Sequence, residues 1–222
     1  VLFADEWFHP WYPLWFLISL LAMGAGAIEM TSLLRQTSIG PPLNSVLGAV
    51  AAITVANWLP HLGETLWTPA VTSPGTVGYD PSSPLAALAW PFLTIVAAIM
   101  ISFLMQAMRF ETPGPSTLEL AGVIFVIAYM GCLGTFFIQT RWLEGPYHGV
   151  PPLLLFIATA KCADVGAYTV GRLAGRHKLC RRLSPNKTIE GAIGGMVFAV
   201  GVAFLMDFLI RRFLGVVTMG PQ

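Results

Sequence analysis

Long apolar runs, separated by shorter polar or proline-rich connections, divide the chain into six segments. A helix needs about 20 mostly apolar residues to cross a hydrocarbon core of roughly 30 Å, and each segment has about that length. The pattern therefore predicts an all-α, polytopic membrane protein with about six transmembrane helices, forming a single membrane-embedded domain over residues 1–222. We expect the helices at residues 11–34, 42–59, 85–108, 118–140, 150–173 and 188–210.

The longest connection, at residues 61–84, is rich in Pro, Gly, Ser and Thr and contains no Lys or Arg. Its Ser73-Pro74-Gly75 step is a turn signal, so we expect a loop there. The composition of the whole chain agrees with the membrane class, because 55% of its residues are hydrophobic and only 10% are charged.

A net charge of +1 hides an uneven distribution of Lys and Arg. With the N-terminus outside, the inner ends hold eight of these residues and the outer ends three, which the positive-inside rule favours. The inner group is Arg35, Arg109, Arg172, Arg176, Lys178, Arg181, Arg182 and Lys187, and the outer group is Arg141, Arg211 and Arg212. This orientation makes the basic loop 175–187 cytoplasmic and predicts the cell inner (cytoplasmic) membrane as the location.

A cytoplasmic cationic cluster beside a bilayer suits anionic phospholipid headgroups or a phosphorylated substrate. Nucleic-acid binding is disfavoured, because the chain has no separate soluble basic domain. The three cysteines, Cys132, Cys162 and Cys180, lie in or beside predicted helices without metal-ligand spacing. We expect buried thiols there and no disulfide framework.

Polar residues gather on one face of the fifth predicted helix. At 100° per residue, Lys161, Asp164, Tyr168 and Arg172 fall on a stripe roughly 80° wide. A charge at membrane depth costs about 2.5–3.5 kcal/mol on insertion scales, so the stripe is expected to face a protein interior or a water-filled cavity. The alternative is that Lys161 and Asp164 only pair with each other to hold two helices together.

The end of the basic loop allows two helix starts. Ser184 can be the N-cap with Pro185 in the first helical position, so that free helix N–H groups and Lys187 form a phosphate site. Alternatively, Thr188 is the cap and Glu190 lies in the first turn, and Lys187 is then an ordinary solvated loop residue.

Other polar and glycine positions have simpler interpretations. Glu29 lies in the first helix and either lines the same cavity as the stripe or lies near the interface, supported by Arg35. Asp207 is expected to pair with Arg211, four residues further on. The Gly171-x-x-x-Gly175 and Gly191-x-x-x-Gly195 steps are expected to permit close approach of helices or backbone.

The polar residues between positions 164 and 195 resemble a known family in their order and spacing. The run reads Asp164-Val165-Gly166-Ala167-Tyr168, Gly171-Arg172, Gly175-Arg176-His177-Lys178-Leu179 and Leu183-Ser184-Pro185-Asn186-Lys187-Thr188-Ile189-Glu190-Gly191-Ala192-Ile193-Gly194-Gly195. It closely resembles the phosphatidate cytidylyltransferase family, also called CDP-diacylglycerol synthases. The first four helices resemble the family's membrane region more loosely, with Glu29 at a position that suits its first-helix Glu.

The resemblance implies an enzyme of phospholipid biosynthesis that transfers a cytidylyl group from CTP to phosphatidate and releases pyrophosphate with Mg²⁺ assistance. By this analogy Asp164 and Lys187 are catalytic, and Asp164 orients a cation or the nucleotide. Lys187, Arg172 and the helix end at Ser184 would hold phosphates, and Glu190 would steady the loop. The implied substrate-binding set is Lys161, Tyr168, Arg172, Ser184, Thr188 and Glu190. Anionic phospholipid is a further expected partner, and a homodimer is left open.

One departure from the family concerns its C-terminal signature, a Ser-x-x-Lys-Arg stretch followed by Lys-Asp, His-Gly-Gly and Asp-Arg. None of it occurs up to Gln222. We therefore expect a C-terminally incomplete chain, with the main metal ligands beyond Gln222, which could lack activity by itself. The alternatives are a related polyprenol or phytol kinase, a transporter whose pathway the stripe lines, and a non-catalytic membrane protein.

Overall fold

The computed structural model describes residues 2–9, 11–36, 40–61, 84–108, 114–143, 149–180 and 184–214. Within these ranges six helices are long and apolar enough to cross a membrane. They are α2 (Pro13–Gln36), α3 (Leu43–Ala56, continuing as a span to His61), α5 (Pro84–Met108), α6 (Pro115–Gln139), α7 (Val150–Ala174) and α8 (Ile189–Leu214). The predicted all-α polytopic membrane protein is confirmed, and each predicted helix agrees with its counterpart to within four residues at either end.

Short elements complete the described chain: α1 (Leu2–Asp5), η1 (Glu6–Phe8), η2 (Thr140–Trp142), β1 (Lys178–Cys180) and β2 (Ser184–Thr188). Of the predicted loop 61–84, His61 ends the second span and Pro84 begins α5, while residues 62–83 lie outside the described residues. The chain forms two compact units, Val1–Trp142 and Leu143–Gln222, and each is described by itself.

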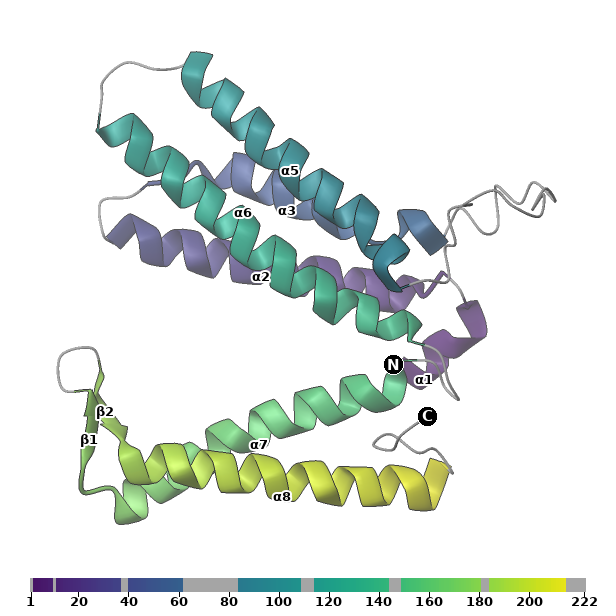
Figure 1. Ribbon diagram of the computed structural model, residues 1–222, viewed down its shortest axis with the longest axis vertical. Helices are drawn as coiled ribbons and strands as arrows, with labels where there is room; N and C mark the ends of the chain where they lie inside the picture. The colour runs from purple at the N-terminus through teal and green to yellow at the C-terminus, as the bar shows by residue number, and fades with distance from the viewer. Residues whose placement is uncertain are drawn as a thin grey trace. The chain divides into compact units, whose positions relative to one another are not determined.

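The first unit is an antiparallel bundle of α2, α3, α5 and α6, in which successive helices alternate in direction (Figure 1). Helix α3 packs against the other three. Interior positions carry apolar side chains with less than a tenth of their surface exposed, namely Trp15, Met23, Ala27, Val46, Val50, Ile53, Ile95, Val123, Val126, Ile127 and Ile138. Many large apolar side chains on the outside of the bundle are exposed, as expected where lipid replaces water.

Polar side chains close the end of this bundle where α2 begins. The buried Asp5 carboxylate accepts the backbone N–H groups of Leu14 (3.1 Å) and Trp15 (2.8 Å), which satisfies donors in the first turn of α2. The Trp15 indole donates to the Ile138 carbonyl (3.2 Å) near the end of α6. These hydrogen bonds fix the start of α2 beside the end of α6.

The second unit is a helical hairpin in which α7 and α8 pack against each other, with the β1–β2 ribbon at the end where α7 finishes and α8 begins (Figure 1). Small residues make this close packing possible. A methyl group added at Gly191 would lie 2.8 Å from the Ala167 carbonyl oxygen, and one added at Gly195 would lie 2.9 Å from that of Ala163. The prediction that Gly191-x-x-x-Gly195 permits close approach is confirmed.

Strands β1 and β2 pair antiparallel, with Lys178 opposite Thr188 and Cys180 opposite Ser184. The predicted helix start, with Ser184 as N-cap and Pro185 in the first turn, is therefore wrong. Helix α8 begins at Ile189, and the Thr188 hydroxyl accepts the Gly191 backbone N–H (3.2 Å) as its N-cap. Proline is tolerated in the edge strand of a ribbon, so Pro185 does not prevent the pairing. The alternative interpretation, with Thr188 as the cap and Glu190 in the first turn, is confirmed.

Candidate functional site

The polar stripe of α7 lies on the face of the helix that points away from α8. Ala163, Ala167 and Val170 contact glycines of α8. Counted at 100° per residue, these positions lie roughly 100–160° around α7 from the middle of the stripe. All four stripe residues are accordingly exposed within the second unit: Lys161, Asp164, Tyr168 and Arg172.

Side-chain contacts join only part of the stripe. The guanidinium of Arg172 donates from Nη1 to the Tyr168 hydroxyl (3.0 Å), which fixes the charged group near the end of α7. Between Lys161 and Asp164, both within the described ranges, there is no ion pair. The alternative that these two residues only neutralise each other therefore has no support in this unit.

The end of α7 and the end of β2 meet through Gly171 and Thr188. A methyl group added at Gly171 would lie 3.1 Å from the Thr188 hydroxyl, and one at Gly175 would lie 2.7 Å from Thr188 Cγ2. This close contact confirms the expected role of the Gly171-x-x-x-Gly175 step. Because Arg172 follows Gly171 and Lys187 precedes Thr188, the segments that carry these two cations are held side by side.

Lys187 lies on β2 and is exposed. Lys187 is next to the buried Thr188, in a part of β2 where the register of the pairing with β1 shifts between Lys178 and Cys180. Ser184 begins the same strand and is half-buried. The structure thus brings Arg172, Ser184, Lys187 and Thr188 to one end of the helical hairpin. Asp164 lies eight residues before Arg172, about 12 Å back along α7.

Glu190, in the first turn of α8, faces the start of the ribbon. Its carboxylate accepts the backbone N–H groups of Arg176 (3.1 Å) and His177 (3.2 Å) and the ring Nδ1 of His177 (2.6 Å). The His177 carbonyl in turn accepts the Ile189 N–H (2.9 Å). His177 was not among the predicted site residues, because its proximity to Glu190 follows from the ribbon pairing. Recognising the ribbon would have revealed it.

Two further carboxylates lie outside this cluster. Glu29 is exposed on α2 in the first unit, and no ion pair joins it to Arg35 among the described side chains. Arg35 donates instead to the Pro41 carbonyl (3.4 Å). The expected pairing of Asp207 with Arg211 is confirmed, with Nε 2.7 Å from Oδ2. That Glu29 lines a cavity with the stripe stays a prediction.

Metal-ligating side chains are scarce in the part of the chain that the structure describes. No three His, Cys, Asp or Glu side chains there come close enough together to hold a metal ion. Asp164 is therefore a single candidate ligand, and the described residues do not by themselves fit a metal centre.

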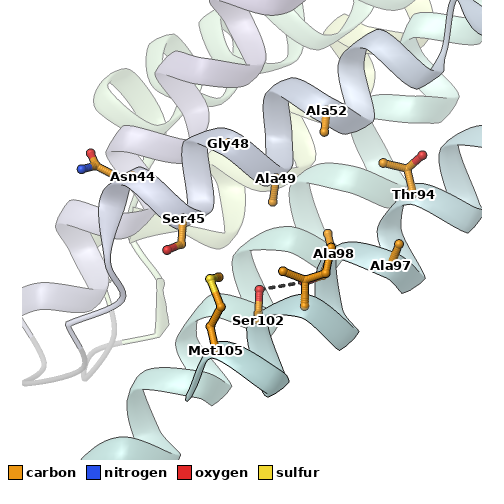
Figure 2. Close-up of a pocket in the computed structure, with 11 residues that line it drawn as sticks. Asn44, Ser45, Gly48, Ala49, Ala52, Thr94, Ala97, Ala98, Ser102 and Met105 are labelled. Atoms are coloured by element: carbon orange, nitrogen blue, oxygen red, sulfur yellow. Dashed lines mark hydrogen bonds between the residues drawn. The ribbon is translucent and has the colours of Figure 1, made fainter. Parts of the chain in front are cut away.

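A groove of about 440 Å³ lies between α3 and α5 of the first unit (Figure 2). Small residues line much of it, and the Ser102 hydroxyl at its wall donates to the Ala98 carbonyl of its own helix (2.7 Å). The lining contains no charged residue and none of the predicted site residues. The candidate site is therefore the ribbon end of the second unit together with the stripe on α7.

Comparison with known proteins identifies the family of the chain. The model of the cytidylyltransferase family matches residues 7–220. The chain therefore belongs to the cytidylyltransferase family, and the resemblance drawn from the polar run is confirmed.

Curated relatives carry the name phosphatidate cytidylyltransferase. The protein from Staphylococcus haemolyticus is 37% identical over 95 residues, which is 43% of this chain and 35% of the relative. The protein from Staphylococcus saprophyticus is 36% identical over 103 residues, which is 45% of this chain and 38% of the relative. The matches thus cover little more than a third of the length of these relatives. No solved structure matches the chain.

Proposed function

We propose that the full-length protein transfers the cytidylyl group of CTP to phosphatidate, giving CDP-diacylglycerol and pyrophosphate. The observation that carries this proposal is the pair of exposed cations, Arg172 and Lys187, held on adjacent segments by the contact between Gly171 and Thr188. Membership of the cytidylyltransferase family and the name of the curated relatives support it.

In the proposed reaction a phosphatidate phosphate oxygen attacks the α-phosphorus of CTP. The bond from that phosphorus to the oxygen bridging to the β-phosphorus breaks, and pyrophosphate leaves with the electron pair. Both reactants are anionic, so cationic side chains that hold the phosphates together reduce their repulsion and stabilise charge in the transition state. Lys187 and Arg172 take this role, and the Ser184 hydroxyl is a further donor to phosphate.

The position of the ribbon would allow both a water-soluble substrate and a lipid substrate to reach it. It lies where two helices long enough to span a membrane end together, and therefore near a membrane surface (Figure 1). Water-soluble CTP can reach this position from one side, and phosphatidate can reach it from the bilayer. We place this surface on the cytoplasmic side of the inner membrane, where exposed Arg176 and Lys178 would also attract anionic phospholipid.

Mg²⁺ is part of the same proposal, because a divalent cation can neutralise phosphate charge and orient the leaving group. Asp164 is the candidate ligand on α7. Since the described residues do not by themselves fit a metal centre, no step of the reaction is assigned to the ion.

The test replaces each of two lysines of the ribbon separately in the full-length protein. Lys187→Ala should lower CDP-diacylglycerol formation by roughly a hundredfold, because it removes a cation expected to contact developing charge. Lys178→Ala is the matched control. It removes the same charge from the same ribbon, but from the other strand, where Lys178 lies opposite Thr188.

Formation of radioactive CDP-diacylglycerol is measured in membranes that contain equal amounts of each variant. We expect Lys178→Ala to keep activity within about threefold of wild type, as is usual for a surface charge outside a site. Equal losses for the two variants would contradict the proposal, because the ribbon would then act only as a diffuse basic patch.

A further inference from the structure

The Glu190 carboxylate accepts hydrogen bonds from three N–H donors of its own protein. Oε1 accepts from the His177 ring Nδ1 (2.6 Å) and from the His177 backbone N–H (3.2 Å). Oε2 accepts from the Arg176 N–H (3.1 Å) and shares the His177 N–H (3.2 Å). A carboxylate offers about four acceptor positions in all. Glu190 therefore has little capacity left to bind a nucleotide hydroxyl or a metal ion directly.

These contacts join three elements at the base of the ribbon. Glu190 belongs to the first turn of α8, while Arg176 and His177 lie between α7 and β1. The Ile189 N–H donates to the His177 carbonyl (2.9 Å), so His177 is bound by backbone and side chain at once. Thr188, which comes directly before Ile189, caps α8 and contacts Gly171. Fixing His177 therefore fixes the strand that carries Lys187 relative to the end of α7.

His177 contributes through its hydrogen bond and not through packing, because 76% of its side chain is exposed while Glu190 is only 27% exposed. An ionised carboxylate can only accept, so Nδ1 of the imidazole must carry the hydrogen in this contact. An asparagine side chain places its amide nitrogen close to the position of Nδ1. A glutamine side chain places its amide nitrogen closer to Nε2 and cannot replace the contact in the same way.

We infer that His177 and Glu190 together are positioning residues, which hold the base of the ribbon so that Lys187 and Arg172 present their charges in a fixed arrangement. The inference rests on the proposed function, because it gives these two residues a part in cytidylyl transfer without contact with substrate. Of the two roles expected for Glu190, it favours steadying the loop over binding substrate.

The first experiment compares His177→Asn with His177→Gln in the full-length protein, measuring kcat/KM for CTP. The asparagine variant should stay within about threefold of wild type, whereas the glutamine variant should lose about tenfold or more, the usual effect of a lost hydrogen bond to a charged group. Equal activity of the two variants would overturn the inference, since the position of the donor nitrogen would then be irrelevant.

A double-mutant cycle separates positioning from direct binding by Glu190. If the His177 side chain acts only through Glu190, the double variant should lose no more activity than Glu190→Ala alone, while His177→Ala, which leaves two backbone N–H groups bound to the carboxylate, should lose less. Losses that multiply in the double variant would mean that Glu190 acts independently of His177. That result would contradict the inference.

Hydrogen exchange of the purified protein without nucleotide tests the same contacts independently of activity. The amides of Arg176 and His177 should exchange about tenfold faster in Glu190→Ala, because their acceptor is removed. His177→Asn should keep the protection that His177→Gln loses in part. Equal exchange in these two variants overturns the inference even if CTP is not a substrate. If exchange follows the prediction but no variant turns over CTP, the proposed function fails and the support of the ribbon stands.

Discussion

Asp164 is a charged residue of α7 that is costly to place inside a membrane. It lies near the middle of a helix apolar enough to cross a membrane, and its side chain is exposed within its own unit. A carboxylate that faced lipid there would cost about 2.5–3.5 kcal/mol on insertion scales. The stripe is therefore expected to meet a polar surface or water inside the membrane.

Asp164→Asn should lower cytidylyl transfer by the full-length protein at least about tenfold while leaving its level in the membrane unchanged. The amide keeps the shape of the side chain and removes the charge that would orient a cation or the nucleotide. Asp207→Asn is the control, since Asp207 is paired with Arg211 near the C-terminal end of α8, away from the ribbon. Normal turnover of Asp164→Asn would leave Asp164 with a structural role at most.

The sequence predicted the positions of some site residues but not the contacts of others. Helical periodicity alone places Lys161, Asp164, Tyr168 and Arg172 on one face, and the contacts of α7 with α8 agree with that placement. The partnership of His177 with Glu190 was not visible, because the two residues are 13 positions apart. Only the antiparallel pairing of β1 and β2 brings them together, and the short polar strands carry no alternation of apolar residues that would predict it.

At the scale of elements, the junction between β2 and α8 shows how local signals compete. Ser184 and Thr188 are both good N-cap residues, and Pro185 suits a first helical turn. The choice between them depends on contacts distant in sequence, namely strand pairing with β1 and the space that Gly171 and Gly175 leave for Thr188. The long apolar helices needed no such information, because length and composition determine them.

The packing of α7 against α8 gives a prediction at this scale. Gly191→Ala should lower the stability of the protein in detergent by about 1–3 kcal/mol, because its methyl group would lie 2.8 Å from the Ala167 carbonyl oxygen. Gly201→Ala, on the same helix, meets no heavy atom within 4 Å. It should be neutral or slightly stabilising, since alanine favours helix by about 1 kcal/mol over glycine.

Thermal unfolding of both variants is measured by the loss of the monodisperse peak in gel filtration after heating. The midpoint temperatures of the two variants are then compared. A midpoint for Gly191→Ala as high as that for Gly201→Ala would mean that the two helices are not held by this close contact.

At the scale of the whole molecule, the alternating helices of the first unit place the end of α2 and the end of α6 at opposite ends of the bundle (Figure 1). Arg35 and Arg141 thus lie at opposite ends, as the orientation predicted from charge requires. Arg109, Arg181 and Arg182, which also entered that prediction, lie outside the described residues. With the N-terminus outside, as the charge distribution predicts, six spans would place the ribbon in the cytoplasm.

Cysteine labelling of intact cells tests this orientation. In a background without the native cysteines, Trp7→Cys, at a side chain that is 91% exposed before α2, should react with a membrane-impermeant maleimide. Asn186→Cys, exposed on β2, should react only after the membrane is opened. Labelling of both from the same side would contradict the topology.

The central claim, that this member of the cytidylyltransferase family transfers a cytidylyl group, is tested most directly by following the individual phosphates of CTP. Purified full-length protein is given phosphatidate, Mg²⁺ and CTP that carries radioactive phosphorus at either the α- or the γ-position. Label from the α-position should enter the extracted lipid, with one pyrophosphate released for each lipid labelled, and label from the γ-position should stay in the water phase as pyrophosphate. Label from the γ-position in the lipid would show phosphoryl transfer, the reaction of a kinase, and would contradict the account.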